Sequence, residues 1–324
     1  MNPYLYDYLA SMKKILLLVP HYNLGLIIKM LIAWIMSIRP NFKEAGRIYG
    51  ERKNEIILQW LENRYGYLVP ETIIPPPTHS DEPERIFVFW WQGTDGLPDI
   101  VRICINSIKQ NSNGREVVMI TKDNIRQWAD IPHYIFDQVS SGAITITHLS
   151  DILRVCLLYQ HGGYWIDATV FMNAPLNDID FNPFFGSIKI HDRFTGTISE
   201  YRWTTFFLFA AKGSEAMKTF REVLLTYFNE NRGRIIDYLL IDYTFEMLYR
   251  KSSDFRKIVD ETPYTNEHLY DLVGHLNDVV PVNQYFQSVS DTHIFKLTWR
   301  NKFSRMVEGR DTLYGQLISC FGGQ

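Results

Sequence analysis

Charged side chains interrupt an apolar segment near the middle of the sequence. Asp151 and Arg154 stand three residues apart between Leu149 and Tyr159, so on a helix they share one face. Asp167 and Thr169 follow a short aromatic run. A guanidinium binds phosphate through its planar, permanently charged fork, and carboxylate oxygens bind divalent cations. These residue types could therefore hold a phosphorylated ligand, or Asp151 and Arg154 could form an ion pair that only fixes the helix.

The elements that position these residues are a helix and a strand. Ser150 is predicted as the N-cap of a buried helix, with Asp151 in its first turn. Gly162 and Gly163 are predicted to end that helix, because glycine enters the left-handed cap without a Cβ penalty. Residues 164–166 have the composition of a strand. Asp167 is therefore expected at the end of a strand, where a lone aspartate is otherwise a common turn residue.

This order of elements resembles a known enzyme family. An Asp-x-x-Arg helix is followed by the turn Tyr159-Gln-His-Gly-Gly163, an aromatic strand and a terminal Asp-x-Asp-like element. The pattern resembles the sugar-nucleotide glycosyltransferases of the DXD-containing family 32. It is most similar to the bacterial capsular polysaccharide synthesis branch, and the likeness extends to glucosylating toxins. It covers residues from about 86 to 303.

The resemblance implies a fold and an activity. The expected fold is α/β, a GT-A-like, mostly parallel sheet flanked by helices. The expected activity is retaining transfer of a sugar from a nucleotide-sugar, in particular a UDP-sugar, to a lipid-linked glycan of a capsule or other surface polysaccharide. By the same resemblance Asp151 and Arg154 contact the donor sugar and its diphosphate, and Gly162, Gly163 and Tyr164 belong to the donor site.

The resemblance also implies a divalent metal, Mn²⁺ or Mg²⁺, near the diphosphate. Asp167 and Thr169 occupy the positions of its ligands. Here the sequence departs from the family, because Thr169 replaces the second acidic residue and a hydroxyl is a much weaker ligand than a carboxylate. We therefore expect that a divalent metal stimulates the activity but is not strictly required to assemble the site.

Two further segments match the family more loosely. Trp91-Gln92-Gly93 matches a Trp-x-Gly element of the related toxins, which predicts that Trp91 stacks on the base and Gly93 lies beside it; the alternative is a core tryptophan. His293 and Lys296 have the spacing His-x-x-Lys, and related enzymes close the site with a C-terminal loop that bears such residues. The alternative for this segment is an ordinary edge strand.

Predicted elements divide the chain into two regions. Residues 1–78 are expected to be helical, and Pro75-Pro-Pro77 begins a stiff linker. Residues 79–324 are expected to form the transferase domain. Within it, a strand at 86–91, a helix at 99–110 and a strand at 117–121 give a βαβ unit and hence a parallel sheet. Ligands bind beyond the carboxyl ends of such strands, where Trp91 and Asp167 would both lie.

Several alternatives stay open. The apolar stretch 15–38 is interrupted by Pro20, His21 and Lys29. We therefore expect either a helix at a membrane surface or a helix packed on the protein, and rank a single membrane-spanning helix third. Asp242 and Glu246 face either an acceptor or solvent. A non-catalytic nucleotide-sugar or glycan-binding module, or a nucleotide-sugar hydrolase, would also fit.

Composition narrows the functional classes. The 324 residues carry a formal net charge of −3, which excludes the basic surface expected of a nucleic-acid-binding domain. Three cysteines, Cys104, Cys156 and Cys320, show no metal-ligand spacing. They indicate a reducing compartment, and the expected location is the cytoplasm, with the inner face of the cell membrane as a further expectation.

Overall fold

The computed structural model describes residues 3–39, 41–74, 84–176, 182, 184–191 and 196–322. Its helices and strands follow in chain order: α1 (Pro3–Leu18), α2 (Leu24–Ile35), α3 (Phe42–Tyr65), η1 (Gly66–Leu68), β1 (Ile86–Phe89), α4 (Asp99–Gln110), β2 (Val117–Ile120), α5 (Ile125–Trp128), α6 (His133–Ser140), α7 (Ile146–His161), β3 (Gly163–Ile166), β4 (Val170–Met172), β5 (Phe185–Ser187), β6 (Phe207–Ala210), α8 (Glu215–Asn231), α9 (Leu240–Lys251), α10 (Ser253–Glu261), α11 (Leu272–His275), α12 (Val282–Ser288), β7 (Ile294–Lys296), β8 (Met306–Val307), β9 (Arg310–Asp311) and α13 (Leu313–Phe321).

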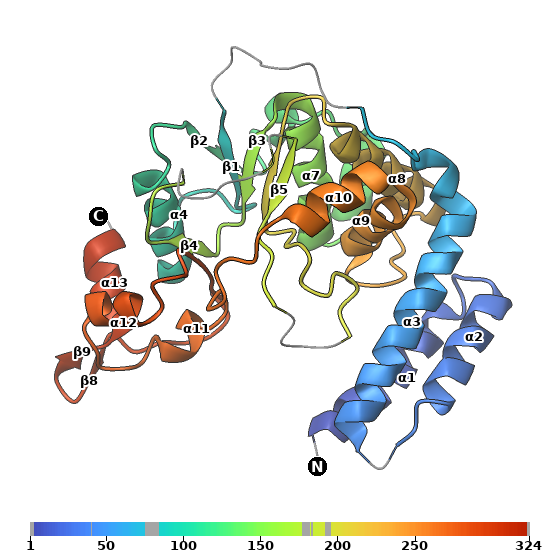
Figure 1. Cartoon of the computed structure of the whole chain (residues 1–324), viewed down its shortest axis with the longest axis horizontal. Coiled ribbons are helices and arrows are strands. Elements are labelled where there is room, and N and C mark those ends of the chain that lie inside the picture. The colour runs from blue at the N-terminus through green and yellow to red at the C-terminus, as the bar shows by residue number, and fades with distance from the viewer. Residues whose placement is uncertain are drawn as a thin grey trace.

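A five-stranded sheet in the order β2-β1-β3-β6-β5 lies at the centre of the molecule (Figure 1). β1 pairs in parallel with β2 and β3, while β6 runs antiparallel to both β3 and β5. Four strands therefore share one direction and only β6 opposes them. The predicted α/β fold with a mostly parallel sheet flanked by helices is confirmed, and so is the predicted βαβ unit of β1, α4 and β2.

Helices cover both faces of this sheet because the strand residues alternate between two apolar cores. Phe87 and Phe89 of β1 belong to the core formed with α7, α8 and α9. Ile86 and Val88 belong to the core on the opposite face, together with Val101 of α4. This alternation is the period of two that a strand imposes. Side chains buried on both faces explain the continuous apolar runs in the sequence.

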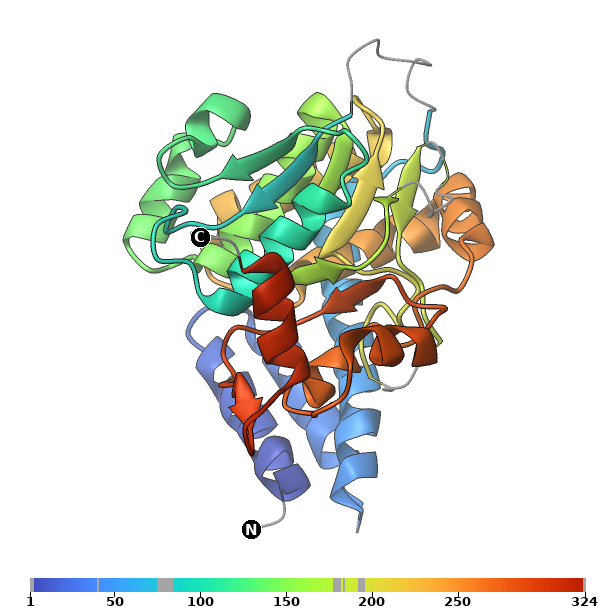
Figure 2. The same ribbon diagram turned by 90° about the vertical axis from the view of Figure 1, so that its left-hand side faces the viewer.

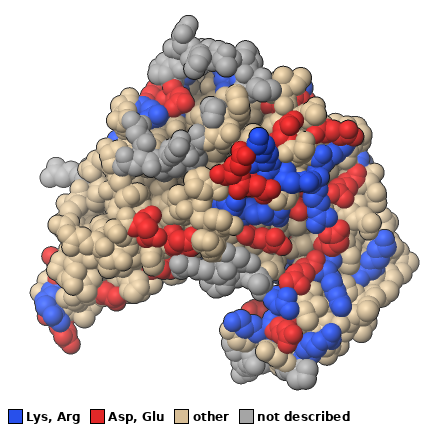
Figure 3. All heavy atoms as spheres, viewed as in Figure 1, with Lys and Arg blue, Asp and Glu red and all other residues tan. Residues whose placement is uncertain are grey.

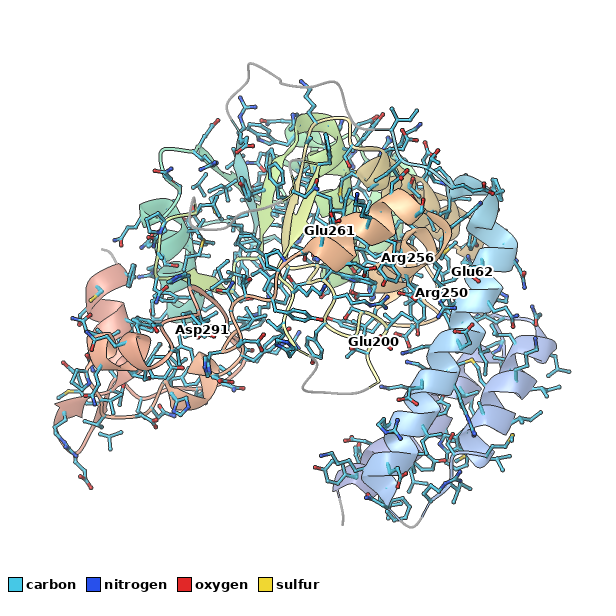
Figure 4. All side chains as sticks on the ribbon, viewed as in Figure 1. Glu62, Glu200, Arg250, Arg256, Glu261 and Asp291 are labelled. Carbon is cyan, nitrogen blue, oxygen red and sulfur yellow. The ribbon has the colours of Figure 1, made fainter. Side chains whose placement is uncertain are left out.

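The N-terminal helices share a core with the rest of the chain. Side chains of α1, α2 and α3 lie in the same apolar cluster as those of α7, α8 and α9. The Tyr22 hydroxyl lies 2.7 Å from that of Tyr227, and Tyr243 donates to Asn54 at 2.8 Å. Figure 4 labels Arg250 and Glu62 where α9 and α3 face each other. The predicted linker and the boundary at residues 78 and 79 lie outside the described residues.

A smaller C-terminal layer lies against α4. β7 pairs antiparallel with β4, which follows β3 directly. An apolar cluster joins α4 to α11, α12 and α13, and Figure 2 shows α13 beside α4 on this side of the molecule. The segment that carries Lys296 therefore forms a short strand, β7, after the helix α12.

The start of α7 differs from the prediction. Thr145 is the N-cap, with its side chain accepting from the His148 amide, so Ser150 and Asp151 lie inside the helix. Threonine is a common capping residue, although serine is slightly preferred, and the apolar Ile146 and Leu149 extend the buried face toward Thr145. The predicted N-cap at Ser150 is wrong, whereas the predicted end at Gly162 is confirmed.

Candidate active site

Helix α7 presents Asp151 and Arg154 to the interior of the protein. Arg154 Nη2 lies 3.0 Å from Asp151 Oδ1, and the two side chains are only 5% and 9% exposed. Burial of two opposite charges is tolerated because they are paired and hydrogen-bonded. The ion-pair interpretation of their spacing therefore holds, and it does not by itself exclude a role in binding.

Backbone and hydroxyl oxygens fix the guanidinium of Arg154. It donates from Nε to the Ser150 carbonyl at 3.2 Å, from Nη1 to the Thr205 carbonyl at 2.5 Å and from Nη2 to Ser150 Oγ at 2.8 Å. Thr205 precedes β6, so Arg154 joins the helix to the edge of the sheet. A guanidinium held from three sides acts as a fixed positive charge with little freedom to follow a ligand.

Strand β3 delivers Asp167 to the same place. Asp167 Oδ1 lies 3.7 Å from Arg154 Nη2 and accepts from Trp165 Nε1 at 2.9 Å. The Arg154 guanidinium also lies 5.1 Å from the centre of the Trp165 ring, within cation–π range. Asp151, Arg154 and Asp167 thus converge. Trp165 was missed as a site residue, although its position two before Asp167 places both side chains on one face of a strand.

Lys296 reaches Asp167 from β7. Its Nζ lies 2.6 Å from Asp167 Oδ2 and 2.9 Å from Thr169 Oγ1. The pairing of β4 with β7 sets Val170 opposite Lys296, which brings the end of the chain to the strand that follows Asp167. The Asp167 and Lys296 side chains are 25% and 21% exposed, so they are the more accessible pair of the cluster.

The environment separates the carboxyl pKa values. Burial raises the pKa of Asp151 to about 7, although Arg154 opposes this rise. Burial likewise raises the pKa of Asp242 to about 6, against the hydrogen bond from Trp203 and the charge of Arg154. For Asp167 burial also acts upward, but Lys296 and Arg154 outweigh it and hold its pKa below the ordinary value. Divergent carboxyl pKa values in one cluster are typical of functional sites.

Asp242 and Glu246 are both buried on α9, so the alternative of an exposed helix face is wrong. Asp242 Oδ1 accepts from Trp203 Nε1 at 2.9 Å. Glu246 lies 2.6 Å from Arg202 Nη2 and 2.8 Å from Arg250 Nε. Glu246 is thus neutralised by two arginines and serves packing, whereas Asp242 shares its electrostatic environment with Asp151 and Arg154.

Trp91 and Gly93 follow the carboxyl end of β1. Trp91 is half-buried, and its ring stacks edge-on with Phe89 at 6.3 Å, which in turn lies 6.4 Å from Trp165. Gly93 has φ +89° in the turn after the strand. Trp90 contacts the C-terminal segment, with Trp299 edge-on at 5.8 Å. The structure therefore brings both tryptophans to the edge of the sheet where Asp167 lies.

Gly162, Gly163 and Tyr164 lie at the opposite end of β3. A Cβ on Gly162 would overlap the Lys212 amide nitrogen, and one on Gly163 would overlap the Arg85 carbonyl oxygen. The Tyr164 ring packs on Phe209 at 4.8 Å and lies under Arg115. The structure does not bring these three residues together with the carboxylates. Their positions account for them as close-packing residues between neighbouring segments.

His293 is also apart from the cluster. It precedes β7 and lies an odd number of residues from Lys296, so the two side chains leave opposite faces of the strand. Its amide donates to Asn266 Oδ1 at 2.7 Å. Of the predicted His-x-x-Lys pair, the structure therefore places only Lys296 beside Asp167.

The predicted metal ligands fit a divalent cation poorly. Asp167 and Thr169 supply one carboxylate and one hydroxyl, and both already accept from Lys296. In the part of the chain that the structure describes, no group of three or more His, Cys, Asp or Glu side chains could hold a metal ion. The Lys296 ammonium would repel a divalent ion bound beside Asp167, which offsets part of the attraction between that ion and the carboxylate.

The cluster faces the side on which the chain's two ends extend. The carboxyl ends of β1 and β3 point toward the lower side of Figure 1, where the C-terminal layer and the N-terminal helices project on either flank. The space-filling view is hollowed along this edge between the two flanks (Figure 3). Asp167 and Lys296 thus lie at the sheet edge where α/β proteins bind ligands.

Comparison with known proteins assigns the family. A model described as capsular polysaccharide synthesis protein matches residues 39–317. The chain therefore belongs to the capsular polysaccharide synthesis protein family. The match begins just before α3, so α3 is part of the family's common unit and α1 and α2 precede it.

One curated relative is the O-glycosyltransferase braB of Annulohypoxylon truncatum, with 26% identity over 140 residues. That alignment covers 40% of this chain and 30% of the fungal protein. Among solved structures, the PaToxG glycosyltransferase gives a TM-score of 0.38 at 14% identity, covering 64% of this chain and 79% of that chain. The apo structure of the WbbM bifunctional glycosyltransferase gives 0.39 at 10% identity, covering 77% and 51%.

Proposed function

We propose that the protein is a retaining glycosyltransferase that moves a sugar from a nucleotide-sugar, in particular a UDP-sugar, to a lipid-linked glycan of a capsule or other surface polysaccharide. The observation that carries the proposal is the convergence of Asp151, Arg154, Asp167 and Lys296 at the carboxyl edge of the sheet. Membership of the capsular polysaccharide synthesis protein family supports it. Retention of configuration rests on the sequence resemblance.

The cluster supplies what sugar transfer requires. A diphosphate leaving group gains negative charge as its bond to the sugar breaks, so fixed positive groups stabilise the transition state. Lys296, the more accessible cation, is positioned to contact the diphosphate, while the buried Arg154 adds its field and holds Asp167. Asp167 and Asp151 can accept hydrogen bonds from ribose or sugar hydroxyls. Trp91, at the same edge, offers a ring for the base.

The N-terminal helices support a membrane-bound acceptor. Leu24, Ile28 and Ile32 recur every four residues along α2 and are exposed, and Ile35 continues the same face. The opposite face of α2 is buried. Between residues 4 and 39 the chain has four basic residues and one acidic residue. An exposed apolar stripe flanked by positive charge suits the surface of an anionic bilayer.

No helix within the described residues is long and apolar enough to cross a membrane. Because of the exposed apolar stripe of α2, we place α1 and α2 on the membrane surface and the sugar-transfer site beside it. The three cysteines are free of disulfides, which supports a reducing compartment. The proposed location is the cytoplasmic face of the cell membrane.

Turnover tests the proposed function. The probes are UDP-glucose, UDP-galactose and UDP-N-acetylglucosamine, with release of UDP measured with and without a lipid-linked oligosaccharide fraction. The wild type should release UDP in the presence of that fraction. Asp167→Asn and Asp151→Asn should each lower the rate by at least about 10²-fold, while Asp137→Asn, an exposed aspartate on α6, should not.

The outcomes separate the competing functions. UDP release without any acceptor would indicate a hydrolase. Stabilisation by a UDP-sugar without release of UDP under any condition would indicate a binding module. A ligand concentration of about a hundredfold over Kd stabilises a protein by about 2.7 kcal/mol, which is readily measured. Equal rates in the wild type and both cluster variants would overturn the assigned site.

A further inference from the structure

Lys296 is held in the donor site by the fold itself. Its amide donates to the Leu269 carbonyl at 2.7 Å, and the next amide, of Leu297, donates to the Thr169 carbonyl at 2.8 Å. Its ammonium lies 4.6 Å from the centre of the Phe206 ring. The backbone and the aromatic ring thus position this lysine independently of its ion pair. An ammonium fixed in this way is a built part of the site.

Two of the three ammonium N–H bonds are used within the described part of the chain. They go to Asp167 Oδ2 at 2.6 Å and Thr169 Oγ1 at 2.9 Å. An ammonium has three donors and no acceptor, so one donor is left for an oxygen of a ligand. The side chain is 21% exposed, which leaves that donor within reach of a bound diphosphate.

The charge balance of the cluster explains the departure at Thr169. Two carboxylates with a divalent cation sum to zero charge, and so do one carboxylate and one ammonium. A second acid at position 169 would leave the Asp167–Lys296 pair with an uncompensated negative charge. A threonine hydroxyl instead accepts from the ammonium without adding charge. Thr169 and Lys296 are thus matched to each other.

We propose that the Lys296 ammonium takes the place of a divalent metal at this site, so that the protein binds a nucleoside diphosphate and its sugar without a metal ion. This inference rests on the proposed function. During transfer, the bond from C1 of the sugar to the β-phosphate oxygen breaks, and its electron pair stays on that oxygen. The acceptor oxygen bonds to C1, and its proton passes to the leaving phosphate. Lys296 neutralises the charge that develops there.

Binding of nucleoside diphosphates tests this inference without relying on turnover. Calorimetric titrations with UDP, and with GDP, ADP and dTDP for comparison, are made in chelator and in Mn²⁺. For the nucleotide that binds, the wild-type affinity should be the same within about twofold in both conditions. Lys296→Met should weaken it at least tenfold, and Lys296→Arg should retain more of it because the positive charge remains.

A double substitution provides a converse test. Thr169→Asp combined with Lys296→Met restores two acids and removes the ammonium, so its nucleotide binding should require Mn²⁺. Lys302→Met, at an exposed lysine of the same segment, is the matched control and should behave as the wild type. Thermal unfolding of each variant distinguishes lost binding from lost fold.

The failures are distinguishable. Wild-type binding that appears only with Mn²⁺ would overturn the replacement of the metal and leave the glycosyltransferase proposal standing. The same holds if Lys296→Met folds normally and binds as tightly as the wild type in chelator. Absence of binding by every diphosphate in both conditions would overturn the nucleotide-sugar function and this inference with it.

Discussion

Arg154 affects the pKa values of all three carboxyl groups in the cluster, those of Asp151, Asp167 and Asp242. It opposes the burial that raises the pKa of Asp151 and Asp242, and with Lys296 it lowers that of Asp167. Because its own donors are satisfied by Ser150 and Thr205, its position does not depend on a ligand. A preorganised charge of this kind stabilises a transition state without reorganisation during the reaction.

The raised pKa of Asp151 predicts a dependence of stability on pH. Its ordinary value is 3.8 and its value in the fold is about 7. Between these values the folded state binds more protons than the unfolded state, so this group's contribution to the free energy of unfolding falls as pH rises. In Asp151→Asn that contribution is absent. Relative to the wild type, the variant should therefore gain stability from about pH 4 to pH 7.

Urea unfolding of both proteins between pH 4 and pH 8 measures this difference. The gain should continue to about pH 8 and level off above it, where Asp151 is ionised in both states. Asp123→Asn, at an exposed position, should differ from the wild type by a constant amount over the same range. Parallel stability curves for Asp151→Asn and the wild type would contradict the raised pKa.

Local spacing made part of the site predictable. Asp151 and Arg154 share a helix face, and Asp167 follows a strand, so their convergence could be expected from sequence. Lys296 was proposed only through a loose His-x-x-Lys match, and its partner Asp167 lies 129 positions earlier. No short-range period connects residues so far apart. The pair depends on β4 and β7 meeting, which only the tertiary fold determines.

At the scale of elements, the two ends of β3 have different tasks. Asp167 follows its carboxyl end, while Gly162 and Gly163 at its amino end let α7 and β3 approach their neighbours. Gly163 has φ +89° and meets the backbone of Arg85, which leads into β1. The resemblance assigned these glycines to the donor site, whereas in the structure they align β3 with β1. The position of Asp167 depends on that alignment.

Gly163→Ala should destabilise the protein by at least about 2 kcal/mol, because a Cβ adds steric overlap to the strain of a positive φ. Gly93→Ala is the matched control, since Gly93 has the same φ of +89° with no atom within 4 Å of the added Cβ. Gly93→Ala should cost about 1 kcal/mol. Denaturant unfolding compares the two, and equal losses would show that strain alone, rather than overlap, makes glycine necessary at residue 163.

Element boundaries show where the sequence was ambiguous. The prediction of α4 at residues 99–110 agrees with the structure, because its apolar positions recur with helical spacing between clear breaks. The start of α7 was misplaced because Thr145 and Ser150 are both capping residues. The choice between them is made by packing, since Leu149 is fully buried and Ile146 packs against the same apolar core.

At the scale of the whole molecule, the N-terminal helices bury one side in the main core and expose apolar side chains on the other. α3 contacts α9, and Lys53 Nζ lies 2.6 Å from Asp237 Oδ2. Basic and acidic side chains are interspersed over α3, α9 and α10 in Figure 3. The composition of residues 1–78 predicted helices, but it could not show that they complete the core of the remaining chain, because burial depends on which surfaces meet.

The exposed face of α2 predicts binding to anionic membranes. The wild type should co-sediment with vesicles of phosphatidylglycerol and phosphatidylcholine, and a smaller fraction of it should co-sediment with vesicles of pure phosphatidylcholine. Ile28→Asp with Ile32→Asp should lower the partition at least tenfold, since each buried isoleucine contributes about 1.5–3 kcal/mol. Added salt should weaken binding through its effect on Lys13, Lys14, Lys29 and Arg39.

Met306→Asp is the control, because Met306 is an exposed apolar residue on the distant β8. It should sediment as the wild type does. A wild type that stays in the supernatant with anionic vesicles would contradict the membrane assignment. A second result would also contradict it: light scattering that shows a dimer for the wild type and a monomer for the variant with both α2 substitutions. The apolar stripe would then bind a second copy of the chain.

The pairing of β4 with β7 gives the site an unusual sensitivity to chain length. Val170 opposes Lys296 in a ladder of only three residue pairs. A shift of one residue in that ladder would turn the lysine to the other side of the strand. Relatives that lengthen or shorten the segment before β7 must therefore conserve its register, or they lose the ammonium from its place beside Asp167 while every side chain of the cluster remains in the sequence.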